Sequence, residues 1–151
     1  MDPGALGSLG VGTGFAFAAK LANPDKEVLC YYGDGSFGMT AFDIETADRF
    51  GMPFIAVIGN NSAMNQIRYG QLAKYGQQKG DIANKLGDMK FSDFPKMWGA
   101  HGIEVCKPNE ISSALNEARE LVNKTKKSVV INIWVDPNEY APGTKAQTMY
   151  K

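Results

Sequence analysis

The sequence predicts an α/β protein built on an open, mostly parallel sheet with helices on both faces. Two short apolar runs, residues 28–32 and 53–59, have the composition of strands buried on both faces. The segment between them, residues 36–50, carries apolar side chains at helical spacing, followed by Gly51 and Pro53. A strand, a helix and a strand in this order form a βαβ unit, whose strands run parallel with a right-handed crossover.

The other elements follow from shorter patterns. The inner face of the helix at residues 36–50 is predicted to be Phe37, Thr40/Ala41, Ile44 and Ala47. The remaining predictions are a helix at 15–22, a loop and short helix within 64–90, a short amphipathic helix at 91–98, a strand at 102–106, a helix from an Asn109 cap to Val122, and a buried strand at 128–135.

Composition indicates one globular domain with no electrostatic preference for nucleic acid or a membrane. The chain has 151 residues, of which 44% are hydrophobic and 21% charged. Sixteen basic residues balance sixteen acidic ones, and no apolar run approaches the roughly 20 residues of a membrane helix. Cys30 and Cys106 are too few for a disulfide scaffold, so we expect reduced thiols and a cytoplasmic protein.

Glycines are concentrated at the start of the chain, just before the first predicted helix. Five of them lie within residues 4–14. A glycine-rich loop before a helix can bind an anion or a cofactor through backbone N–H groups. It can equally let two elements pack closely, and this segment alone does not favour either interpretation. The dinucleotide-binding fingerprint is absent, because the spacing differs and no strand precedes it.

Asp34 and Asn61 are 27 residues apart, and each follows one of the two predicted strands. The carboxyl ends of parallel strands meet at one edge of a sheet, where ligands of such folds bind, so the two side chains should converge. A carboxylate and an amide oxygen suit Mg²⁺, and Gly35 and Ser36 beside them suit a diphosphate. These residues are also common in ordinary turns, and a turn without a ligand explains them about equally well.

These residues also carry a resemblance to a known family. Gly33-Asp34-Gly35-Ser36 followed by Asn60-Asn61 resembles the thiamine diphosphate signature, GDG followed by NN. Gly7-Ser8-Leu9-Gly10 is similar to the loop that holds the aminopyrimidine in the same enzymes. The whole chain resembles the C-terminal, diphosphate-binding domain of acetolactate synthase-like enzymes, a group that includes 2-hydroxyacyl-CoA lyases.

The resemblance implies a role for each matching residue. Mg²⁺ would be bound by the side chains of Asp34 and Asn61 and by the backbone carbonyl of Ala63. Leu9 would lie under the thiamine diphosphate and hold it bent. The residues implied at the cofactor are Gly7, Ser8, Leu9, Gly33, Asp34, Gly35, Ser36, Asn61, Ala63, Met64 and Gln66.

The resemblance also implies a partner. In this family a glutamate from an N-terminal pyrimidine-binding domain, usually of the other subunit, activates the cofactor, and nothing in this chain matches that domain. We therefore expect residues 1–136 to form a thiamine-diphosphate/Mg-binding domain incomplete at its N-terminus, and residues 137–151 a tail that covers the active site. We expect a homodimer or homotetramer, and no activity from this chain alone. A non-catalytic fragment or a partner-dependent subunit is the alternative.

The loop after Asn61 bears on the substrate. Acetolactate synthases tend to carry a tryptophan where this chain has Gly70. Gln66-Ile67, Gln71 and the opening residues 2–7 look more like 2-hydroxyacyl-CoA lyases. The resemblance thus favours a lyase or carboligase acting on a 2-hydroxyacyl-CoA, with acetolactate synthase or a 2-oxoacid decarboxylase as the alternative.

Four further residues invite a functional interpretation. We expect a structural role for His101, the single histidine, which precedes a predicted strand. Cys30 lies within a predicted strand and should belong to the core, whereas Glu45 would face a domain interface. Arg68 is open to two equal interpretations, a contact with a substrate anion or a solvated loop arginine.

Overall fold

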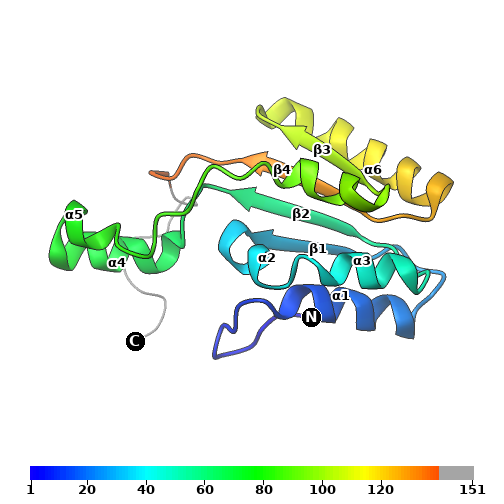
Figure 1. The fold of residues 1–151 in the computed structure, drawn as a ribbon, viewed down its shortest axis with the longest axis horizontal. Coiled ribbons are helices and arrows are strands. Elements are labelled where there is room, and N and C mark those ends of the chain that lie inside the picture. Colours follow the sequence, from blue (N-terminus) through cyan, green and yellow to red (C-terminus); the bar gives the residue numbers. More distant parts are fainter. Residues whose placement is uncertain (140–151) are drawn as a thin grey trace.

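The computed structural model describes residues 1–139 and contains a four-stranded parallel sheet. The strands lie in the order β1-β2-β4-β3, and every neighbouring pair is parallel. They span Leu29–Gly33 (β1), Ile55–Asn60 (β2), His101–Val105 (β3) and Val129–Trp134 (β4). This confirms the predicted open parallel α/β architecture (Figure 1).

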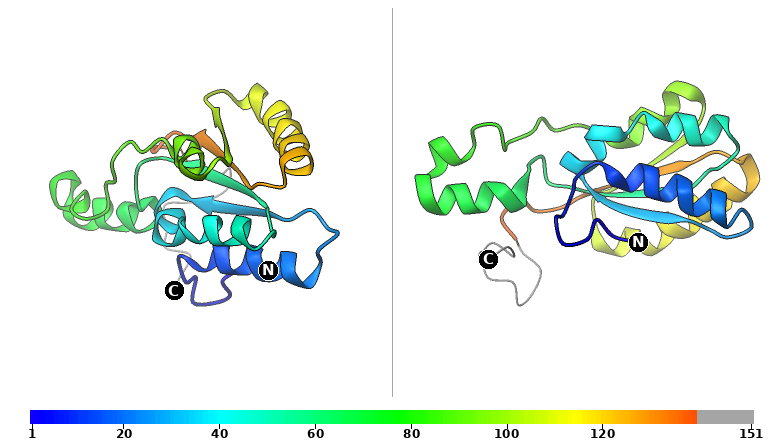
Figure 2. Two further views of the ribbon diagram at one scale, coloured as in Figure 1. Left: turned by 45° about the vertical axis from the view of Figure 1, so that its right-hand side comes forward. Right: turned by 90° about the horizontal axis from the view of Figure 1, so that it is seen from below.

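Helices cover both faces of the sheet (Figure 2). One face packs against α1 (Val11–Ala22), α2 (Asp34–Thr40), α3 (Asp43–Arg49) and the 3₁₀ helix η1 (Phe91–Trp98). The other packs against α6 (Ile111–Thr125), which follows the short 3₁₀ turn η2 (Pro108–Glu110). Each face therefore has its own apolar cluster, the first centred on Phe37 and Ile44 and the second on Val129 and Ala118.

The predicted single helix at residues 36–50 is wrong, because the structure divides it into α2 and α3. The N–H of Ile44 donates to the carbonyl of Ala41, and that of Glu45 to the carbonyl of Phe42. These three-residue hydrogen bonds tighten the chain into a 3₁₀-like turn between the helices. The predicted inner positions are confirmed: Phe37, Ala41, Ile44 and Ala47 are buried, and Thr40 is half-buried.

Strand β1 differs from the prediction that it is buried on both faces. It lies at an edge of the sheet, and α6 covers only the part formed by β2, β3 and β4. Leu29 and Tyr31, which point toward the α6 side, are consequently 54% and 70% exposed. Tyr32 and Cys30 point to the other face, where Tyr32 is buried and Cys30 partly buried against the core.

Two helix starts also differ from the sequence-based boundaries. Helix α1 begins at Val11, so it includes Gly12, where a Cβ atom would lie only 2.5 Å from the Tyr32 ring. Close packing therefore explains part of the glycine-rich run. Asn109 does not cap α6; the Glu110 carboxylate instead accepts hydrogen bonds from the N–H groups of Cys106 and Lys107, both at 3.1 Å.

Helices α4 (Asn65–Tyr75) and α5 (Gln77–Gly80) extend beyond the carboxyl end of the sheet (Figures 1 and 2). They take the place of the predicted loop and short helix. None of the helices within residues 1–139 combines the length and the apolar composition that crossing a membrane requires.

A buried carboxylate joins segments that lie far apart in the sequence. Asp48 is buried and accepts hydrogen bonds from the Ser128 N–H at 2.7 Å, the Ser128 hydroxyl at 2.5 Å and Trp98 Nε1 at 2.8 Å. Replacement by alanine leaves three donors without an acceptor, two of them on buried Ser128 and one on half-buried Trp98. We therefore expect Asp48→Ala to lower the free energy of unfolding by about 2–4 kcal/mol.

Chemical denaturation measures this loss. The matched control is Asp43→Ala, since Asp43 lies on the same helix but is exposed. We expect the control to change the free energy of unfolding by less than about 1 kcal/mol, since Asp43 contributes only through the dipole of the helix. Equal effects of the two substitutions would contradict the role assigned to Asp48.

Candidate functional site

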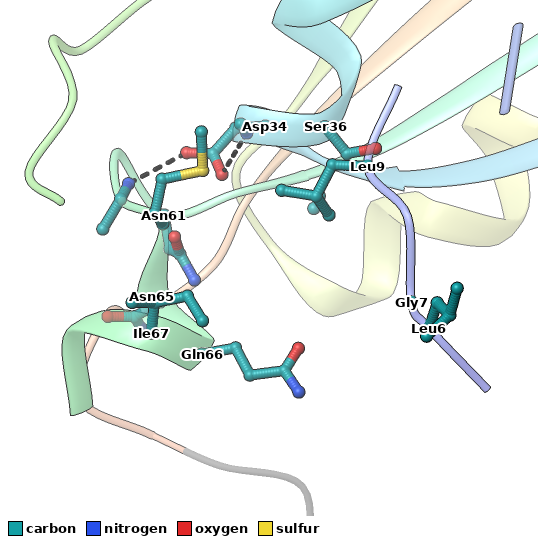
Figure 3. A pocket seen from close by; sticks show the side chains of 14 residues that line it. Leu6, Gly7, Leu9, Asp34, Ser36, Asn61, Asn65, Gln66 and Ile67 are labelled. Atoms are coloured by element: carbon teal, nitrogen blue, oxygen red, sulfur yellow. Dashed lines mark hydrogen bonds between the residues drawn. The ribbon is translucent and has the colours of Figure 1, made fainter. Parts of the chain in front are cut away.

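Asp34 and Asn61 lie together at the carboxyl edge of the sheet. Strands β1 and β2 are neighbours, with Gly33 paired to Gly59. Asp34 is the first residue of α2 directly after β1, and Asn61 directly follows β2. The convergence expected from the βαβ geometry is therefore present, as Figure 3 shows.

The Asp34 carboxylate is buried and bridges the loops after β1 and β2. It is only 4% exposed. One oxygen accepts the Gly35 N–H at 2.9 Å, and the other accepts the Ala63 N–H at 3.0 Å. Burial raises the pKa of Asp34 above its usual range, while these backbone donors act in the opposite direction. The two hydrogen bonds occupy one lone pair of each carboxylate oxygen.

The two adjacent asparagines have different environments. Asn60 is fully hydrogen bonded: its Nδ2 donates to the Met89 carbonyl at 2.8 Å and to Asn132 at 2.9 Å, and its Oδ1 accepts the Ser62 N–H at 3.1 Å. The Oδ1 of Asn61 is buried and has no hydrogen-bond partner among the described residues. A buried carbonyl oxygen without a donor is destabilising, which indicates that a ligand completes this site.

The backbone N–H and C=O groups of Ala63 face Asp34. Ala63 forms an antiparallel bridge with Lys85, flanked by hydrogen bonds from Leu86 N–H to the Ser62 carbonyl and from Met64 N–H to the Asn84 carbonyl, both 2.7 Å. In extended backbone the N–H and C=O groups of one residue point to the same side. Since the Ala63 N–H donates to Asp34, its carbonyl also faces the Asp34 side.

A cavity of about 510 Å³ opens at this edge. Ten of the eleven residues implied at the cofactor line it, and Ser8 does not. In Figure 3, Leu6, Gly7 and Leu9 of the N-terminal segment lie on one side, and Asn61, Gln66 and Ile67 on the other. Four further residues line the cavity: Leu6, Gly59, Asn65 and Ile67.

These four were missed for different reasons. Asn65 and Ile67 lie in the first turn of α4, a helix that the polar sequence of this segment did not place. Gly59 lies near the end of β2, one position before the motif. Leu6 adjoins the glycine-rich loop, and its 91% exposed apolar side chain is evident only in the structure.

The polar groups that line the cavity offer oxygen atoms to a ligand. Within residues 1–139, no three His, Cys, Asp or Glu side chains gather around a possible metal position. One carboxylate, one amide oxygen and one backbone carbonyl form a set suited to a hard cation that also binds water and phosphate oxygens. The buried oxygen of Asn61, without a hydrogen-bond partner in the described part of the chain, fits such a cation.

Other polar residues lie away from this cavity. His101 is at the opposite end of the sheet, at the start of β3, where its Nε2 is hydrogen bonded to the Thr125 hydroxyl at 3.1 Å. Arg68 binds Asp81 at 2.6 Å and does not line this cavity, but it lines a second cavity of about 650 Å³ that shares Asn61 and Ala63 with the first. Glu45 is partly exposed and paired with Arg49 at 3.2 Å.

The chain matches a known domain family over most of its length. Residues 1–133 match the family described as thiamine pyrophosphate enzyme, C-terminal TPP binding domain. Thiamine pyrophosphate is the same compound as thiamine diphosphate.

Curated relatives agree with this match. The chain is 34% identical to 2-hydroxyacyl-CoA lyase 2 of Homo sapiens, over 97% of this chain and 23% of the relative. The same lyase of Mus musculus is also 34% identical, over 95% of this chain and 22% of the relative. The acetolactate synthase large subunit of Haemophilus influenzae is 32% identical, over 93% of this chain and 24% of the relative.

The chain thus spans about a quarter of the length of the curated relatives that it matches. The fold, the signature residues at the sheet edge and the family match lead to one conclusion. The chain belongs to the family of thiamine pyrophosphate enzymes, in which it corresponds to the C-terminal TPP-binding domain.

Proposed function

We propose that this chain binds Mg²⁺ and the diphosphate of thiamine diphosphate within an enzyme that breaks or forms C–C bonds. The observation that carries the proposal is the buried Oδ1 of Asn61, which has no hydrogen-bond partner within residues 1–139 and lies beside the buried Asp34 carboxylate. An unsatisfied buried polar group costs about 1–3 kcal/mol, and a cation at this position would remove that cost.

Three oxygens of this chain would hold the cation: the Asp34 carboxylate, Asn61 Oδ1 and the Ala63 carbonyl. Mg²⁺ usually takes few protein ligands and completes its octahedron with water and phosphate oxygens. The backbone donors that hold Asp34 in place would fix the carboxylate toward the metal.

The rest of the cavity would hold the organic part of the cofactor. Ser36 accepts the Gly10 N–H at 3.0 Å, which leaves its own hydroxyl hydrogen for a diphosphate oxygen. Gly7 and Leu9 would contact the rings from one side, and Met64 and Gln66 from the other. When bound, thiamine diphosphate supplies an electron sink for cleavage or formation of a C–C bond.

The substrate class that we propose is a 2-hydroxyacyl-CoA. Relatives named 2-hydroxyacyl-CoA lyase 2 support it, and so does Gly70 in place of the tryptophan typical of acetolactate synthases. The alternative is acetolactate synthase, which the Haemophilus influenzae relative supports. A 2-oxoacid decarboxylase belongs to the same alternative, because both enzymes would act on a 2-oxoacid.

Activity would require a pyrimidine-binding domain that supplies the activating glutamate, in a homodimer or homotetramer. This chain alone would then show no turnover.

The C-terminal tail would start beside the cavity, because the Pro137 carbonyl accepts a hydrogen bond from Asn65 at 2.8 Å and Asn65 lines the cavity. Residues 140–151 lie outside the described part. Both cysteines are free, which supports a cytoplasmic location.

Calorimetry and product analysis on the complete protein test the proposal. Thiamine diphosphate should bind with Mg²⁺ and lose its affinity in EDTA. The complete protein should release formyl-CoA from a 2-hydroxyacyl-CoA. Release of CO₂ from pyruvate, with no reaction of the acyl-CoA, would reject the lyase and favour the alternative.

Affinity should also depend on pH through Asp34. The carboxylate binds the metal only when ionised, and its pKa is raised by burial. Binding should therefore weaken as pH falls, by about tenfold per unit below that pKa, and the decline should begin above the ordinary aspartate value of about 3.9. Calorimetric titrations from pH 8 down to about 4, corrected for protonation of the free diphosphate, measure it. Affinity that stays constant after this correction would contradict the role of Asp34.

A further inference from the structure

Gly10 attaches the N-terminal segment to helix α2 through both of its backbone polar groups. Its N–H donates to the Ser36 hydroxyl at 3.0 Å, and its carbonyl accepts from the Thr40 hydroxyl at 2.8 Å. Ser36 and Thr40 are four residues apart on α2 and therefore lie on the same face of the helix. One face of α2 thus holds the backbone of Gly10.

The contact is close because residue 10 is glycine. Its φ is 80°, in the left-handed region, and a Cβ atom would lie 3.2 Å from the Cβ of Met39. A larger residue would push the segment away from α2. The position of the backbone is therefore set by the helix and not by a side chain at position 10.

The residues just before Gly10 face the cavity. Leu6, Gly7 and Leu9 line it, and Figure 3 shows Leu9 close to Ser36. Apart from α1 and Gly10, the hydrogen bonds of this segment in the described part of the chain are internal: Gly4 N–H to Asp2 at 2.8 Å and Gly7 N–H to the Gly4 carbonyl at 3.1 Å. The two bonds to α2 are thus the polar anchor of this wall of the cavity.

Buried hydroxyls hold Thr40 from the other side. The Thr40 hydroxyl lies 3.2 Å from that of Thr13, which is 3.2 Å from the Tyr32 hydroxyl. Thr13 and Tyr32 are both buried. Because a hydroxyl has one hydrogen, the shorter bond directs that of Thr40 to the Gly10 carbonyl.

We infer that Thr40 is a positioning residue for the ring portion of thiamine diphosphate. It does not line the cavity; it acts through Gly10, whose placement fixes Gly7 and Leu9 against the rings. The inference rests on the proposed function, since it assumes that the rings occupy the side of the cavity formed by these two residues. Nothing in the thiamine diphosphate signature includes residue 40.

Two ligands separate this role from a general structural one. In the complete protein with Mg²⁺, calorimetry should give a Kd for thiamine diphosphate that Thr40→Val raises about five- to tenfold, the effect of one lost hydrogen bond. The Kd for inorganic diphosphate should change less than about twofold, because Asp34, Asn61 and Ser36 are intact. Thr40→Ser, which keeps the hydroxyl, should restore both values.

Tyr32→Phe is the matched control, because it removes a buried hydroxyl of the same chain of bonds but leaves the Thr40–Gly10 bond. It should lower the Tm and leave the ratio of the two Kd values unchanged. Gly10→Ala tests the same link if Thr40→Val does not fold, and should weaken binding of thiamine diphosphate selectively.

The possible outcomes are distinct. Equal weakening of both ligands by Thr40→Val, no change in either, or the same selective loss in Tyr32→Phe would overturn the inference. A wild-type protein that binds neither ligand with Mg²⁺ would overturn the proposed function itself.

Discussion

Asp34→Ala is expected to weaken Mg²⁺-dependent binding of thiamine diphosphate by at least about 100-fold. Asp34 is the one carboxylate among the three proposed ligands, and its charge offsets that of the cation. It is also held by the N–H groups of Gly35 and Ala63, so its loss releases the loop that carries the Ala63 carbonyl. Calorimetry of the complete protein with and without Mg²⁺ measures the effect.

Asp34→Asn separates charge from shape. Asparagine keeps the size and one acceptor oxygen of Asp34 but removes the charge. We expect it to lose most of the Mg²⁺ dependence as well. Wild-type affinity in Asp34→Asn would mean that the carboxylate is a turn residue and not a ligand, which is the alternative that the sequence left open.

Asn61→Ala is expected to abolish cofactor binding while leaving stability unchanged or slightly higher without metal. Its Oδ1 is buried without a partner, so removing it costs no hydrogen bond within the described chain. Asn60→Ala should do the reverse: it removes three hydrogen bonds and should lower the free energy of unfolding by about 2–3 kcal/mol.

This pair compares neighbouring residues of the same type. Denaturation in EDTA and calorimetry with Mg²⁺ should separate them, with Asn60→Ala retaining the Mg²⁺ dependence of any binding that remains. A large loss of stability in Asn61→Ala, with cofactor binding intact, would show that Asn61 is a structural residue.

Much of this arrangement could be predicted from the sequence, because it depends on local patterns. The apolar runs placed β1 and β2, and a parallel sheet brings their carboxyl ends together, so Asp34 and Asn61 were expected to meet. The resemblance added Leu9 and Gln66, which no periodicity indicates, and both line the cavity.

Features that depend on tertiary packing were not predictable in this way. The break between α2 and α3 preserves a continuous apolar spacing, so the pattern indicated one helix. An apolar run does not reveal whether its strand is central or at an edge, so the exposed Tyr31 face was unexpected. The link from Thr40 to Gly10 joins residues 30 positions apart and leaves no sequence pattern.

The most direct measurement is the anomalous diffraction of Mn²⁺ in crystals of the complete protein with thiamine diphosphate. We predict one peak at bonding distance from an Asp34 oxygen, Asn61 Oδ1 and the Ala63 carbonyl, with diphosphate oxygens completing the coordination. Bound thiamine diphosphate with the metal elsewhere, or with Asn61 Oδ1 turned away from it, would contradict the account.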